Sequence, residues 1–182
     1  MSLLISSLIS LLQPLATLID RTITGIGRSS AWLTLAMVLV TALIVVMRYL
    51  FRTGSISLQE SVIYINAMIF MLGAAYTLKE QGHVRVDIFY RKLGDRGQAL
   101  IDLAGYLLFL FPSMLFIIYI SWDYVAISWQ IREGSAETSG LPYVFLLKSS
   151  IIVLPLLLLL QGISELCKSL LKFWQSAAGS NK

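Results

Sequence analysis

The chain has 182 residues, of which 57% are hydrophobic and only 13% are charged, and its mean hydropathy is +0.80. A soluble domain carries about 25% charged residues, so this composition excludes an ordinary water-soluble fold and predicts a surface that partly faces lipid. The net charge of +4 does not indicate a nucleic-acid partner, because the basic residues lie at the ends of apolar segments. One cysteine and one histidine exclude an internal disulfide, a thiolate cluster and a multi-histidine metal site.

Residues 1–27 place apolar and polar side chains on two faces at steps of three and four, which predicts an amphipathic helix. The segment lacks the basic start and the cleavage site of a signal peptide. We expect it to lie in the membrane interface or against a partner, bent or interrupted near Pro14. An ordinary first span is the alternative, but its polar face would then meet lipid. The glycines of "TGIGRSS" (24–30) predict that this helix ends before the first span.

Four apolar segments are long enough to cross a bilayer, which takes about 20 residues. They cover about residues 31–51, 60–79, 98–122 and 142–165. The third apolar run continues to Ile131 and predicts a helix that tilts or projects from the membrane, with Pro112 as a candidate kink. The sequence therefore predicts an all-α integral membrane protein, with the N-terminal interfacial helix followed by a four-helix transmembrane domain over 28–182.

The distribution of basic residues predicts the orientation. Two precede the first span, five lie between the second and third spans and three follow the fourth, which makes ten on the side of the termini against four on the other. The positive-inside rule then places both termini in the cytoplasm. The polar loop "REGSAETSGLP" (132–142) would face outward.

Polar residues near the span ends are candidates for ion pairs, helix-end anchors or partner contacts. We expect Glu60 and Asp123 to lie within reach of basic side chains at the same membrane face; these are Arg48, Arg52 and Lys148. An Arg52–Glu60 pair would fix the first hairpin. Lys148 could instead extend to the outer surface, or pair with Asp123 on the neighbouring helix.

Two features of the second span predict contact with another helix. Asn66 is the strongly polar side chain near the middle of this span, and an amide there commonly bridges helices. Gly73 begins a small-residue patch, Gly-Ala-Ala, that would let a helix approach closely.

The stretch "GHVRVD" (82–87) resembles a catalytic or metal site because it holds the chain's one histidine, His83, close to Asp87. On a helix these two residues share a face. With no second histidine, no cysteine pair and no enclosing pocket predicted, we interpret the stretch as a short amphipathic cytoplasmic connector between spans two and three, and as a candidate partner contact. The sequence predicts no catalytic, cofactor-binding or metal-binding residue, and no enzyme activity.

The ordered motifs resemble a known family. They are the arginine-rich end of span one followed by Gln59-Glu60, then Leu72-Gly73-Ala74-Ala75 with His83-Val84-Arg85-Val86-Asp87, and Gly140-Leu141-Pro142 opening span four. Over about residues 28–165 the chain resembles the small membrane subunit, of DctQ type, of tripartite ATP-independent periplasmic (TRAP) transporters.

The resemblance implies a non-catalytic subunit in a bacterial inner membrane. Its partners would be a large multi-span permease, a periplasmic substrate-binding protein and membrane lipid, with no nucleic acid. The large subunit would move an organic acid or related solute with sodium, and this chain, which would hold no cofactor, would scaffold it and help dock the binding protein. The alternatives are a small four-span enzyme of the glutathione-dependent transferase type and an accessory subunit of another membrane complex.

Overall fold

A computed structural model describes residues 2–82, 90 and 93–179, with side chains described from Leu12 to Trp174 apart from the gaps. The elements are α1 (Ser2–Leu50), α2 (Ile56–Lys79), α4 (Asp95–Gly105), the π-helical segment η1 (Tyr106–Leu110), α5 (Phe111–Gln130) and α6 (Val144–Gly179). Over these residues the chain is helical with no strand, and four helices are long and apolar enough to cross a membrane. The prediction of an all-α four-span membrane fold is confirmed.

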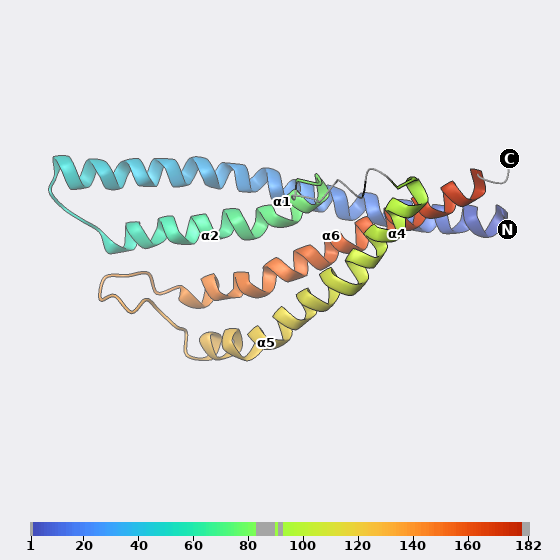
Figure 1. Cartoon of the computed structure of the whole chain (residues 1–182). Coiled ribbons are helices and arrows are strands. Elements are labelled where there is room, and N and C mark those ends of the chain that lie inside the picture. Colours follow the sequence, from blue (N-terminus) through green and yellow to red (C-terminus); the bar gives the residue numbers. More distant parts are fainter. Residues whose placement is uncertain (1, 83–89, 91–92, 180–182) are drawn as a thin grey trace.

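The helices form two hairpins, α1–α2 and α5–α6, whose loops lie at one end of the molecule (Figure 1). We call this the hairpin end, and the opposite end, where both chain termini lie, the terminal end. The α1–α2 hairpin reaches further along the molecule than the α5–α6 hairpin (Figure 1).

The predicted break before the first span is wrong, because α1 is one continuous helix of 49 residues that passes through Pro14 and both glycines of 24–30. The polar residues of this segment are accommodated within the helix. The hydroxyls of Thr24, Ser29 and Ser30 each donate to the carbonyl oxygen four residues earlier. Residues 2–27 are therefore not separated from the first span by a helix end.

The third span is a helical rod made of α4, η1 and α5, which curves along its length (Figure 1). The π-helical turn lies directly before Pro112. Proline lacks an N–H group and its ring crowds the carbonyl four residues earlier, so the helix widens where that bond is lost. The structure thus has a π-helical turn next to Pro112, while a kink at this proline stays a prediction.

The central helix is α6, which packs against α1, α2, α4 and α5. Its leucines, Leu157, Leu158 and Leu160, pack against a buried core of Ile19 and Ile23 from α1 and Ala75 from α2. The two helices α1 and α2 approach closely at Gly27, where an added Cβ would lie 2.5 Å from Cγ of Tyr76. The N-terminal part of α1 is thus packed into the bundle.

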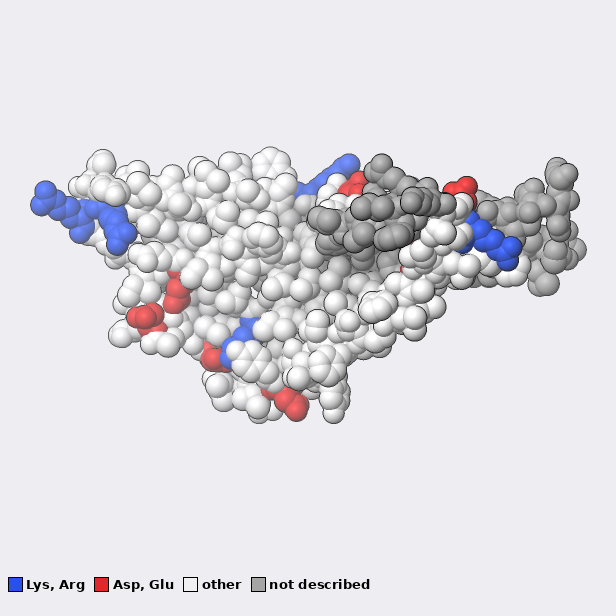
Figure 2. Space-filling model, viewed as in Figure 1, with Lys and Arg blue, Asp and Glu red and all other residues white. Residues whose placement is uncertain are grey.

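Most apolar side chains face outward. In the most apolar stretches of α1, α2 and the α4–α5 rod, only 6% of residues are buried within the chain. The uncharged runs 29–47 of α1 and 61–78 of α2 are each about 28 Å long at 1.5 Å per residue, close to a ~30 Å hydrocarbon core. Figure 2 shows extensive uncharged surface between separate groups of charged side chains. This surface requires lipid or partner helices around it.

Candidate functional site

The loop at 131–143 is attached to the start of α2 by Glu60. Its carboxylate accepts a hydrogen bond from the hydroxyl of Ser135 and another, of 2.6 Å, from the backbone N–H of Leu141. Ser57 adds a third bond by donating to the carbonyl oxygen of Ser139. Within the part of the chain that the structure describes, Glu60 forms no ion pair with Arg52, so that predicted pair is wrong. Glu60 joins the two hairpins instead.

Lys148 lies beside the same loop and pairs with Glu133. Its Nζ is 2.6 Å from Oε2 of Glu133 and lies 4.0 Å from the ring centroid of Tyr124. The hydrogen bonds from Lys148 hold the pKa of the Glu133 carboxyl below its usual range. The alternative pairing of Lys148 with Asp123 is therefore wrong, because a loop carboxylate takes its place.

The tip of the α1–α2 hairpin is basic and apolar at once. Arg48 and Arg52 are exposed there, and neither forms an ion pair with another described residue. Between them Tyr49, Leu50 and Phe51 are between 67% and 77% exposed. Arg52 has a left-handed φ of 53°, which ends α1 and turns the chain toward α2. This projecting tip is available to a partner.

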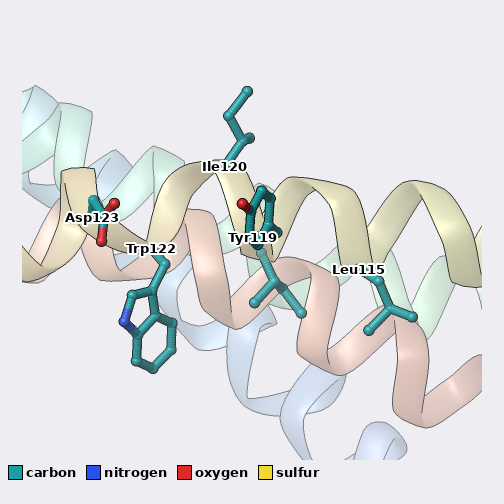
Figure 3. A pocket seen from close by; sticks show the side chains of 6 residues that line it. Leu115, Tyr119, Ile120, Trp122 and Asp123 are labelled. Carbon is teal, nitrogen blue, oxygen red and sulfur yellow. The ribbon is translucent and has the colours of Figure 1, made fainter.

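A shallow groove of about 530 Å³ lies on the outer face of α5 and includes Asp123 (Figure 3). Among the described residues, Asp123 forms no ion pair with Arg48, Arg52 or Lys148. Trp122 and Leu115 project from the same side of the helix, and Asp123 lies at one end of the groove (Figure 3). Exposed aromatic residues with one carboxylate are typical of a membrane boundary.

The outer face of α2 carries Asn66 in the middle of the span. Residues Gln59, Ile63, Asn66 and Phe70 are all exposed and follow one another at steps of four and three, so they form one stripe along the helix. We call it the α2 outer stripe. Asn66 forms no hydrogen bond to another described residue, so any helix that it bridges belongs to another molecule.

Gly73 does not mark a close helix contact within the chain, because nothing lies within 4 Å of an added Cβ there. Of the predicted patch, Ala75 is fully buried against α1. The glycine in the close contact is Gly27, which sequence reasoning had interpreted as part of a break.

A second polar cluster, missed by the sequence analysis, joins α1 to α6 near the terminal end. Asp20 accepts hydrogen bonds from Ser164 (2.7 Å) and Gln161 (3.1 Å), and pairs with Lys168 at 2.8 Å. Lys168 also pairs with Glu165 at 2.7 Å. The sequence shows the polar positions of residues 1–27 and the helical spacing of residues 161, 164, 165 and 168. It does not show that these two sets of residues face each other.

The terminal end also holds α4 against α6. Lys172 donates to the side-chain oxygen of Gln98 at 3.0 Å and lies 3.1 Å from the carboxylate of Asp95. The hydroxyl of Tyr90 donates to Asp102 at 2.8 Å. The predicted candidates His83 and Asp87, and the predicted connector apart from Gly82, lie outside the described residues.

These contacts join helices and loops to one another, and among the described residues no group of three or more His, Cys, Asp or Glu could hold a metal ion. The fold and its polar contacts define a multi-span helical membrane protein with large apolar faces. Residues 37–172, more than half of the chain, match the family model for tripartite ATP-independent periplasmic transporters, DctQ component. The chain belongs to this family, the small membrane subunit of TRAP transporters, and is a transporter component. No curated protein and no solved structure matches it.

Proposed function

We propose that this chain is a non-catalytic small subunit that scaffolds the large permease of a TRAP transporter and helps to dock the periplasmic binding protein. The large subunit would move an organic acid or related solute with sodium. The complex would lie in a bacterial inner membrane, with the terminal end in the cytoplasm and the hairpin end in the periplasm.

The observation that carries the proposal is the outward-facing Asn66. An amide in hydrocarbon without a hydrogen-bond partner costs free energy, and polar groups at mid-span commonly pair across helices. The α2 outer stripe would therefore pack against a helix of the permease. Membership in the DctQ family supports a permease as that partner.

Three features support the scaffold and docking roles. The bonds of Glu60 and the cluster around Asp20 fix both ends of the bundle, which suits a static frame for a moving partner. At the hairpin end, Arg48 and Arg52, which form no ion pair with a described residue, lie on a projecting tip that an acidic face of the binding protein could contact.

The test is sodium-driven uptake in liposomes that contain the permease, with the binding protein supplied on the side of the hairpin end. We expect uptake only when this chain is present. Full uptake by the permease without it would contradict the scaffold role.

The contact at α2 is tested by Asn66→Leu, which should lower co-purification of the permease several-fold. Ser113→Leu is the matched control, because Ser113 is another exposed polar residue of a span, on α5. Equal yields of complex from the two variants would contradict a permease contact through Asn66.

A further inference from the structure

A groove of about 440 Å³ lies between α1 and the last turn of α2, and it shares Asp20 with the polar cluster that joins α1 to α6. It is lined by Thr17, Arg21, Thr24, Gly25, Arg28 and Lys79, together with Asp20. The α1 residues follow at steps of three and four, so they share one face of the helix. We call this the α1–α2 basic groove.

Among the described residues, the groove has more positive charge than the ion pairs there neutralise. The carboxylate of Asp20 is neutralised by Lys168 at 2.8 Å, and Lys79 is paired with Glu80 at 2.8 Å. Arg21 and Arg28 are exposed and form no ion pair with another described residue. Two guanidinium groups on one wall, with no ion pair to a described residue, match a phosphate, which arginine binds through two parallel hydrogen bonds.

The groove lies where two helices reach the membrane boundary. Arg28 directly precedes the uncharged run 29–47 of α1, and Lys79 directly follows the uncharged run 61–78 of α2. Each run is about as long as the hydrocarbon core is thick. The groove is therefore at the depth of lipid phosphates.

The same face of α1 continues as an apolar stripe. Trp32, Leu35 and Leu39 follow Arg28 at steps of four, three and four, and are 74%, 50% and 61% exposed. From Arg28 to Leu39 the helix rises about 16 Å, close to half of a ~30 Å hydrocarbon core. A basic groove followed by one leaflet's length of apolar surface matches a headgroup with its acyl chain.

We propose that the α1–α2 basic groove binds the headgroup phosphate of an anionic phospholipid, with an acyl chain along Trp32, Leu35 and Leu39. Arg21 and Arg28 bind the phosphate, and Gly25 leaves the space between them open, since nothing lies within 4 Å of an added Cβ there. A free phosphate ion would use the groove but gain nothing from the apolar stripe, which favours the lipid.

The test is native mass spectrometry of the purified full chain in a neutral detergent. The chain is titrated with phosphatidylglycerol, with phosphatidylcholine of the same acyl chains, or with inorganic phosphate. We expect the wild type to prefer phosphatidylglycerol over phosphatidylcholine about tenfold or more, and to bind phosphate much more weakly. Arg21→Gln with Arg28→Gln should lower affinity for phosphatidylglycerol about tenfold or more, since each basic residue near a membrane surface contributes substantially.

Gly25→Leu tests the shape of the groove separately from its charge. It keeps both arginines and favours the helix, but fills the space between them, so it should also lose the preference for phosphatidylglycerol. Arg48→Gln with Arg52→Gln removes the same charge at the other end and should retain the preference. The proposal is overturned if the wild type binds both lipids equally, if Gly25→Leu binds phosphatidylglycerol as the wild type does, or if inorganic phosphate binds as tightly as the lipid.

Discussion

At the scale of single residues, Gly25 and Gly27 lie two positions apart on α1 in opposite surroundings. A Cβ at Gly27 would lie 2.5 Å from Cγ of Tyr76, whereas a Cβ at Gly25 would meet nothing within 4 Å. Gly27→Ala should therefore destabilise the contact of α1 with α2 by about 1–3 kcal/mol through overpacking. Gly25→Ala should raise stability by up to about 1 kcal/mol, because alanine favours a helix. Unfolding of the two purified variants in denaturant measures the difference, and equal stabilities would contradict the close contact.

The residues that form the polar contacts at the hairpin end were only partly predictable from the sequence. Glu60 and Lys148 stand out in the sequence because they are charged residues at the ends of apolar segments. Their partners were not predictable, since Ser135, Leu141 and Glu133 belong to a loop whose path depends on how α5 and α6 are placed. Local sequence patterns indicate which charged residue needs a hydrogen-bond or ion-pair partner. The three-dimensional fold determines which residue that partner is.

At the scale of elements, the joint between α1 and α6 depends on one cation shared by two carboxylates. Removing it in Lys168→Met would leave Asp20 and Glu165 facing each other through the site that Lys168 occupied. We expect a loss of about 1–2 kcal/mol, less than for a fully buried pair because the Lys168 side chain is 39% exposed. Adding Glu165→Gln to Lys168→Met should restore much of the stability, because it removes one of the two negative charges. Unfolding of the single and double variants tests this, and a double variant no more stable than Lys168→Met would argue against the shared cation.

The loop at 131–143 should respond to acid through Glu133. Its pKa is lowered by the hydrogen bonds from Lys148, so its contribution to stability is present above the unfolded pKa of about 4.3 and is lost as the pH falls through the folded value. The protection of the loop amides, measured relative to the intrinsic exchange rate at each pH, should therefore fall below about pH 4.3. In Glu133→Gln the acid-induced change in exchange of the loop amides should be missing. The exchange of the Ala16–Ile23 segment should be the same in this variant as in the wild type. The same acid response in the variant and the wild type would exclude Glu133 as its source.

The continuity of α1 shows a limit of local sequence rules. Two glycines among serines and threonines favour a break when the segment is taken alone. In the protein, the hydroxyls of Ser29 and Ser30 donate hydrogen bonds to backbone carbonyls of the same helix. Gly27 leaves space for the ring of Tyr76. Packing against α2 and α6 therefore stabilises a continuous helix that the intrinsic propensities of these residues disfavour. The four spans were predictable because their length and apolar character are set by the bilayer. The central position of α6 and the offset between the hairpins arise from packing between distant segments.

At the scale of the whole molecule, the even number of spans places both termini on one side, and the ten basic residues on that side predict that it is the cytoplasm. The native Cys167 is only 4% exposed, so an introduced cysteine can report orientation against a low background. Glu137→Cys at the hairpin end should react with a membrane-impermeant maleimide in intact cells. Glu80→Cys at the terminal end should react only after permeabilisation, since both glutamates are exposed and differ mainly in the end they occupy. The reverse pattern would overturn the orientation, and with it the assignment of the arginine-bearing tip to the periplasm.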